Sequence, residues 1–291
     1  MVNSNLPTVN VRSRPRATTD GGLNTGGEPV VYRRQRLAQI PTVRMTHTTT
    51  NAPGAGAAPA ALSLPARVFG VLFSPRATYA DVTARPHCLG MLIVLIAIGA
   101  SATFGFLSTE VGRQAMLDRQ IATLESFGRP VTDEMYLGME RGMNIARVTG
   151  PAAQAVFAPL MAAIVAGLLF AIFNAIMGGN ATFRQVYAIV VHSGVITTLS
   201  SLFVLPLAYA QGSMSGATNL RVFFPFLDEA SFLSRFLGSI DLFLLWWLIS
   251  LAIGLGVLYR RKTAPIANGL IGAYVVIGLI IAAVKTALSG A

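Results

Sequence analysis

Two long apolar stretches dominate the pattern of hydrophobic and polar positions along this chain. They flank a short polar turn at residues 178–185, within a segment that runs from residue 151 to residue 210. Each stretch exceeds the roughly 20 apolar residues that a helix needs to cross the hydrocarbon core of a bilayer. The pattern therefore predicts a membrane-spanning helical hairpin.

Three further apolar stretches have a length that suits the same interpretation. The predicted fold is all-α, a polytopic transmembrane bundle of five spans within a membrane domain of residues 89–288. Two long polar connections, residues 108–150 and 211–238, are expected on the outer side. The predicted spans are residues 89–107, 152–177, 186–210, 239–259 and 266–288.

The connection 108–150 carries its own helical patterns. Leu117, Ile121 and Leu124 form one apolar stripe that ends near Gly128. A second helix is expected to start at the N-cap Thr132, and its apolar face is a stripe of methionines at four-residue spacing. The stripe predicts packing onto the membrane or the bundle, or an adaptable binding surface. Its members are Met135, Met139 and Met143.

Residues 63–88 have the pattern of short helices that lie at the membrane interface. Apolar side chains recur at four-residue spacing from Val68 to Phe73, and Ser74 followed by Pro75 favours the start of a second helix. The arginines beside them suit anionic headgroups. We expect either a lipid or partner contact, or a plain membrane-entry segment. The candidate contact residues are Arg67, Phe69, Leu72, Phe73 and Arg76.

Residues 1–62 are rich in Pro, Gly, Thr, Asn and Arg and almost lack aromatic side chains, which predicts a disordered tail. The tail could bind lipid or nucleic acid through its arginines, or it could be an unstructured leader. A third hypothesis is that translation starts at Met45, which opens a short polar N-terminus.

Composition supports the membrane interpretation. Hydrophobic residues make up 53% of the 291 residues and charged residues only 12%, whereas a soluble domain carries about 25% charged residues. The formal net charge is +10, and ten of the 22 basic residues precede the first predicted span. Membrane-surface electrostatics explains that placement, so no nucleic-acid partner is expected.

The distribution of basic residues also predicts an orientation. With a cytoplasmic N-terminus, fourteen basic residues fall on the inner side and eight on the outer side. The cluster Arg260, Arg261 and Lys262 occupies the short loop after the fourth span. The positive-inside rule therefore favours an inside N-terminus and an outside C-terminus in the inner (plasma) membrane.

Three polar residues within the predicted spans are candidate functional groups, because polar side chains are costly in a bilayer. Asn174 and His192 are expected at similar depth on adjacent arms of the hairpin. They could share a hydrogen bond, or His192 could belong to a substrate or proton pathway. Asp241 is expected to cap the fourth span, with a buried proton carrier as the alternative. The hydroxyls near His192 can bond to their own backbone.

The motifs of common enzymes are missing from the sequence. None of the three histidines belongs to a His-Glu-x-x-His run, and Cys88 is the only cysteine. There is no Walker A motif, and Gly178 and Gly179 favour the end of a helix. We therefore expect no catalytic, metal or cofactor site, and no enzymatic activity.

Two short segments resemble members of the Yip1 family, in particular its bacterial branch. They are residues 67–79, Arg-Val-Phe-Gly-Val-Leu-Phe-Ser-Pro-Arg-Ala-Thr-Tyr, and residues 178–187, Gly-Gly-Asn-Ala-Thr-Phe-Arg-Gln-Val-Tyr. The resemblance covers about residues 64–288 and implies five spans with a cytoplasmic N-terminus. Eukaryotic relatives act in vesicle trafficking through small Rab-type GTPases and in membrane shaping. The Asp-Leu-Tyr-Gly-Pro segment of that branch is absent here, so the resemblance does not extend to a GTPase partner.

The sequence is compatible with two functions. The first is a non-enzymatic integral membrane protein that organises the membrane or recruits an unidentified membrane or cytoplasmic protein, with a homo-oligomer as a further option. The second is a small-solute permease or channel component that uses the polar residues of the third span.

Overall fold

The computed structural model describes residues 61–214 and 216–288 of the chain. Within these residues the secondary structure is helical, and the only extended pairing is an isolated bridge between Asn219 and Asp241. The all-α prediction is confirmed. The predictions of a disordered tail and of a start at Met45 concern residues that lie almost entirely outside the described part.

Two short helices precede the first span, as the pattern predicted. Helix α1 covers Leu64–Phe73 and begins at the N-cap Ser63, whose Oγ accepts from the Ala66 amide at 3.4 Å. Helix α2 covers Pro75–Ala84 and starts with proline, which needs no amide partner there. Ser74 occupies the N-cap position of α2, but its side chain makes no capping hydrogen bond.

Helix α3 covers Leu89–Leu107 and matches the predicted first span. Helix α4, Glu110–Ser126, carries the first stripe predicted within the connection 108–150. Helix α5 begins at Asp133, after the N-cap Thr132, as predicted. It runs to Phe170 and continues as the π-helix η1, Ala171–Ile176.

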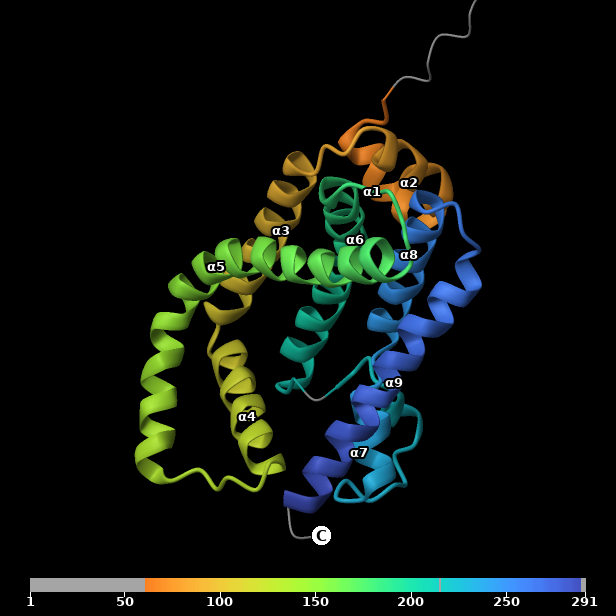
Figure 1. Ribbon diagram of the computed structural model, residues 1–291. Helices are drawn as coiled ribbons and strands as arrows, with labels where there is room; N and C mark the ends of the chain where they lie inside the picture. The colour runs from red at the N-terminus through yellow and green to blue at the C-terminus, as the bar shows by residue number, and fades with distance from the viewer. Residues whose placement is uncertain (1–60, 215, 289–291) are drawn as a thin grey trace, which may run out of the picture. The chain divides into compact units, whose positions relative to one another are not determined.

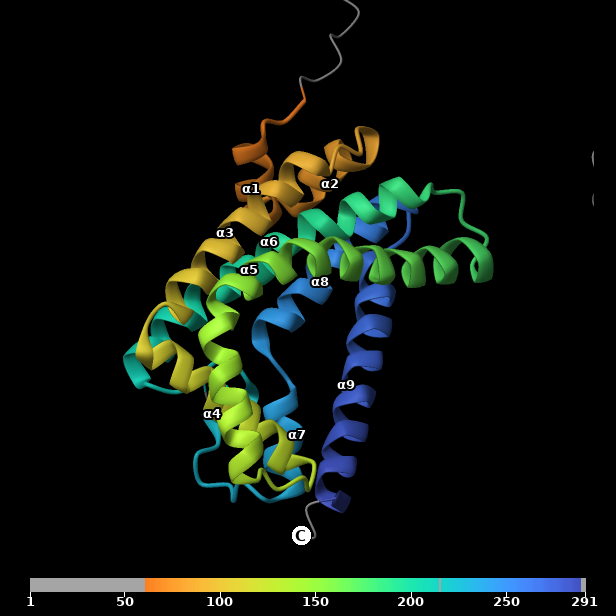
Figure 2. The same ribbon diagram turned by 90° about the vertical axis from the view of Figure 1, so that its left-hand side faces the viewer.

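The connection 108–150 and the predicted second span therefore share one helix, which the sequence pattern did not anticipate. Figures 1 and 2 show that α5 changes direction along its length. Pro151 and Pro159 lie inside it. A proline removes one backbone hydrogen bond and kinks a helix without necessarily ending it.

A tight turn reverses the chain after η1. Gly178 has a φ of +69°, a conformation that favours glycine. Helix α6, Phe183–Gln211, then starts with a capping box formed by Thr182 and Gln185. This order of helix, turn and helix agrees with the predicted hairpin.

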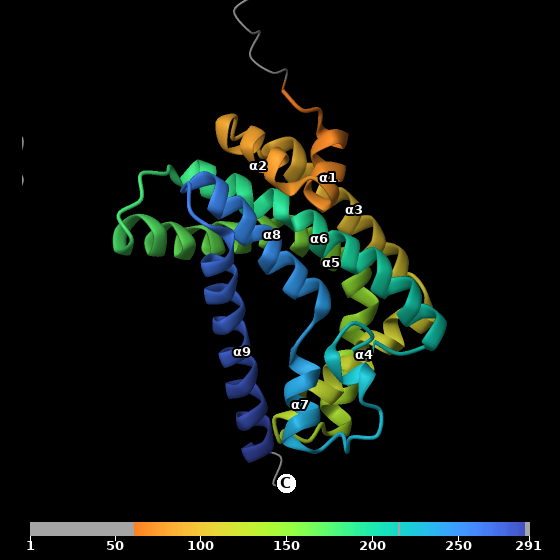
Figure 3. The same cartoon turned by 90° about the vertical axis from the view of Figure 1, so that its right-hand side faces the viewer.

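The second connection holds the short 3₁₀ helix η2, Leu220–Phe223, and helix α7, Phe232–Ser239. Helices α8, Leu242–Leu258, and α9, Thr263–Leu288, complete the described chain. All views show α1 and α2 near one end of the helical bundle, whereas α4, α7 and the last turns of α9 lie toward the other (Figures 1–3).

Four helices among the described residues are long and apolar enough to cross a membrane: α3, α5 with η1, α6 and α9. Helix α8 is apolar throughout but has only 17 residues, which span about 25 Å. The predicted fourth span, residues 239–259, contains α8, three flanking residues outside the helices and the last residue of α7. The count of five spans therefore depends on α8.

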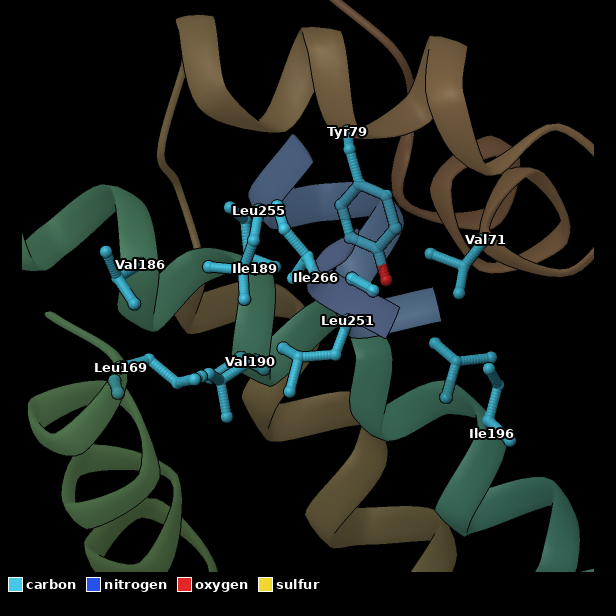
Figure 4. Close-up of a cluster of buried hydrophobic side chains, with 14 of the residues drawn as sticks. Val71, Tyr79, Leu169, Val186, Ile189, Val190, Ile196, Leu251, Leu255 and Ile266 are labelled. Carbon is cyan, nitrogen blue, oxygen red and sulfur yellow. The ribbon is translucent and has the colours of Figure 1, made fainter. Parts of the chain in front are cut away.

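Helix α6 lies at the centre of the hydrophobic core. In the most apolar 18-residue stretch of α6, 44% of the residues are buried. The corresponding share is 17% in each of the other three long apolar helices. Its buried side chains meet Leu251 and Leu255 of α8 and Tyr79 of α2 (Figure 4). The core thus joins the short helices at the start of the chain to the spans that follow.

Candidate functional site

Helices α1 and α2 form a pair that is docked onto the bundle. Val71 of α1 and Tyr79 and Val82 of α2 are fully buried. Helix α2 packs against α8, and α1 packs against α6. The pair is therefore part of the core, and its surface is held in a defined position.

A buried ion pair links the two helices. The Arg67 guanidinium reaches Asp81 Oδ2 through Nε at 3.0 Å and through Nη2 at 2.8 Å. Its Nη1 donates to the carbonyl oxygen of His87 at 3.3 Å. Arg67 is only 5% exposed. The structure thus places this candidate headgroup contact inside the molecule, because Asp81 on the neighbouring helix supplies its counter-charge.

A second buried contact joins α2 to the distant helix α8. The hydroxyls of Tyr79 and Ser250 lie 2.7 Å apart. Burial raises the pKa of the Tyr79 phenol well above its ordinary value, and the hydrogen bond to Ser250 opposes that effect only in part. The phenol is therefore neutral, and its role here is structural.

The connection after α2 is tied to the start of α6. Arg184 Nε donates to the carbonyl of Pro86 at 3.0 Å, and Gln185 Nε2 donates to the carbonyl of Thr83 at 3.1 Å. Both side chains come from the turn whose sequence carried the family resemblance. The turn therefore positions the N-terminal helix pair as well as reversing the chain.

The outer surface of the pair carries two exposed phenylalanines. Phe69 is 63% exposed and Phe73 is 79% exposed, and Arg76 is also exposed. Leu72, in contrast, packs against the core together with Val68. The predicted apolar stripe therefore splits into a buried pair, Val68 and Leu72, and an exposed pair, Phe69 and Phe73. The reason is that neighbouring residues on a helix differ by about 100° in direction.

Asn174 connects the hairpin turn to the end of α8. Its Nδ2 donates to the Ala181 carbonyl at 2.6 Å, and its Oδ1 accepts from the Tyr259 hydroxyl at 2.7 Å. The Tyr259 ring stacks on Phe173 with centroids 4.9 Å apart. The sequence pattern did not indicate Tyr259, because a tyrosine at the end of an apolar helix is common at membrane interfaces.

His192 does not share a hydrogen bond with Asn174. The ring is fully buried, and its Nδ1 lies 2.7 Å from the Ala188 carbonyl of the same helix. Its Nε2 has no hydrogen-bond partner among the described residues. Ser193, Thr197 and Ser201 all donate to carbonyls three or four residues earlier in α6. These polar side chains are thus mostly satisfied by their own helix.

Asp241 caps α8, as predicted. Its Oδ1 accepts from the Leu244 amide at 3.0 Å, and its Oδ2 accepts from the Thr218 hydroxyl. Its own amide donates to the Tyr274 hydroxyl at 2.9 Å. The carboxylate is therefore engaged in fixing the start of α8.

Within residues 61–214 and 216–288, no three His, Cys, Asp or Glu side chains gather as metal ligands would. The docked pair α1 and α2, with its exposed Phe69 and Phe73, is a separate candidate surface for binding.

Comparison with protein families identifies one domain in this chain. The family model described as the Yip1 domain matches residues 69–284. The match begins within α1 and ends within α9, so it covers the second half of α1, all of α2 and most of the bundle. A search of curated proteins found no match, and neither did a search of solved structures.

Proposed function

Because this chain belongs to the Yip1 family, as its resemblance in sequence predicted, we propose that it acts without enzymatic activity to organise the membrane or recruit protein partners. The chain is an integral membrane protein, and its apolar helices contact the lipid bilayer. In our proposal that membrane is a bacterial inner membrane, and the helix pair α1 and α2 is the working surface.

One observation carries this proposal: Phe69 and Phe73 are exposed on a helix pair that is firmly docked. Burying a phenylalanine side chain contributes about 1.5–3 kcal/mol, so two exposed rings on one helix favour contact with lipid or protein. The buried contacts of Arg67 and Tyr79 hold the helices in place before anything binds. A surface ordered in advance loses less entropy on binding.

The proposed topology has five spans, a cytoplasmic N-terminus and an outer C-terminus. Helix α8 is the fourth span in this scheme, because its 17 residues meet the lower limit of about 17 for a crossing helix. Arg260, Arg261 and Lys262 follow it on the cytoplasmic side, in agreement with the positive-inside rule.

A small-solute permease remains the second candidate, and one observation favours it. A cavity of about 280 Å³ is lined by polar groups of α5 and α6 among apolar neighbours, including Gln154, Thr197 and Thr198. Purified protein in vesicles that released a trapped solute would support this function. Unchanged release from a Thr198→Val variant would indicate that the solute does not pass through this cavity.

The proposal can be tested by cysteine labelling in a Cys88→Ser background. Phe73→Cys and the matched control Ala80→Cys both place a thiol at an exposed position. In inverted membrane vesicles, a membrane-impermeant maleimide should label position 73 much more slowly than position 80. After solubilisation in detergent the two rates should become similar. Equal rates in vesicles would show that the surface is uncovered, and the proposal would then fail.

A photo-crosslinking residue at position 69 identifies what covers the surface. Adducts with lipid indicate docking on the bilayer. Adducts with a protein of another mass indicate a recruited partner, and adducts of twice the chain's mass indicate a second copy.

A further inference from the structure

A large cavity with many polar side chains in its wall lies at the end of the bundle away from α1 and α2. Its volume is about 910 Å³, and its walls come from α4, α6, α7, the last turns of α9 and the connection after α6. Figures 1 and 3 show α4, α7 and the end of α9 close to this end. The cavity is distinct from the surface formed by Phe69 and Phe73.

The wall contains buried polar atoms without partners. Ser234 is fully buried, and neither its Oγ nor Arg235 Nη1 has a hydrogen-bond partner among the described residues. Asn219 Oδ1 is in the same situation. All three residues line the cavity. Unpaired buried polar atoms are unfavourable, so the site favours a ligand that supplies both acceptors and a donor.

The carboxylates of the cavity wall are already engaged or face solvent. Glu229 pairs with Arg221 at 3.1 Å, and Asp241 caps α8. Asp118 is exposed and accepts from Gln114 at 2.8 Å. Among the described residues, none of these three forms an ion pair with the remaining cations of the wall.

Three cations of the wall have no acidic partner among the described residues, and one of them, Arg119 of α4, is exposed. The other two lie on neighbouring helices. Arg235 of α7 and Lys285 of α9 both line the cavity, and these two helices pack against each other. Lys285 Nζ lies 5.0 Å from the centroid of the Phe127 ring. Neither cation has a carboxylate within 4.0 Å among the described residues. Their mutual repulsion would be relieved by an anion between them.

We propose that this cavity binds a phosphate group between Arg235 and Lys285, with the Ser234 hydroxyl as a neutral donor. A guanidinium matches the geometry of phosphate oxygens, and an ammonium adds a compact positive charge. The group can belong to free inorganic phosphate or to the headgroup of an anionic phospholipid. The cavity has room for a phosphoglycerol headgroup, whose hydroxyl could donate to Asn219 Oδ1.

The test uses the full-length protein in a neutral maltoside detergent. One arm measures thermal unfolding against sodium phosphate, with sodium chloride at the same ionic strength as the reference. The other arm counts the phospholipids retained per chain by native mass spectrometry. The variants are Arg235→Gln, Lys285→Gln and Ser234→Ala. The control is Arg141→Gln, which removes an exposed arginine of α5 whose Nε bonds to its own helix.

If the source is free phosphate, phosphate raises the unfolding temperature of the parent and of the control. If the source is a headgroup, the parent and the control retain an anionic phospholipid and phosphate alone has little effect. In either case Arg235→Gln and Lys285→Gln should weaken binding by about tenfold or more, as expected for loss of a charge-assisted hydrogen bond.

The Ser234→Ala variant separates a ligand-binding role from a structural one. Without ligand it should be as stable as the parent, because the lost hydroxyl has no partner, yet it should bind more weakly. The proposal is overturned if the parent binds neither probe, or if the cavity variants bind as the Arg141→Gln control does.

Discussion

The hydroxyl of Tyr79 lies 2.7 Å from the hydroxyl of Ser250, so that α2 and α8 are joined inside the core although 171 residues separate them in sequence. Tyr79 is fully buried and Ser250 is 2% exposed. The contact therefore fixes α2 against the core of the bundle.

Replacing Tyr79 by phenylalanine should preserve the docked helix pair at a small loss of stability. The change removes one buried hydrogen bond, which is worth about 0.5–1.5 kcal/mol. Tyr79→Ala should cost far more, about 3–5 kcal/mol, because it also opens a cavity. Thermal unfolding in detergent measures both. If the two hydroxyls are coupled, the double variant with Tyr79→Phe and Ser250→Ala should lose less stability than the sum of the two single variants. Additive losses would contradict the coupling.

Removing the charge of Asp81 should release α1 from the bundle. Asp81→Ala leaves the buried Arg67 without its counter-charge, which costs about 3–5 kcal/mol for a buried pair. The measurement is maleimide labelling of Val71→Cys in a Cys88→Ser background, because Val71 is 1% exposed in the docked state. Labelling should become faster in the Asp81→Ala variant.

The control for Asp81 is the double change Arg67→Met with Asp81→Leu. It removes both charges and keeps apolar volume, so labelling at position 71 should stay slow. Fast labelling in the double variant would mean that the ion pair holds α1 by directed hydrogen bonds that packing cannot replace.

Substitution of Gly254 by alanine should destabilise the bundle. A Cβ at this position would lie 2.5 Å from Ile189 Cγ2 and 3.2 Å from the Tyr79 ring, where α2, α6 and α8 meet. Overpacking of this kind costs about 1–3 kcal/mol. Gly269→Ala is the matched control, since no atom lies within 4 Å of its added Cβ. Similar unfolding temperatures for the two variants would argue against close packing at Gly254.

The proposed topology makes a direct prediction for reporter fusions. Fusions after Met177 and after Tyr259 should report the cytoplasm, and fusions within residues 108–150 and at Ala291 should report the outer side. The physical basis is the basic cluster at residues 260–262, because such clusters tend to be retained on the cytoplasmic side. An outer-side signal after Tyr259 would contradict the proposal that α8 is the fourth span.

The local sequence alone was sufficient for much of the architecture. The length of the apolar run predicted α3, and Thr132 and Asp241 predicted the helix starts that they cap. Pro75 predicted the start of α2. Such features depend on residues within one turn of each other, so their physical causes are visible in a short window of sequence.

The tertiary structure decided which side chains face inward and with which partners. Arg67 and Phe69 are two positions apart, yet one is paired inside with Asp81 and the other is exposed. Asn174 bonds to Tyr259, 85 residues away, and not to His192. Charge, hydrogen bonding and burial at these positions depend on groups that only the packing of distant helices brings together, and no local pattern along the chain contains that information.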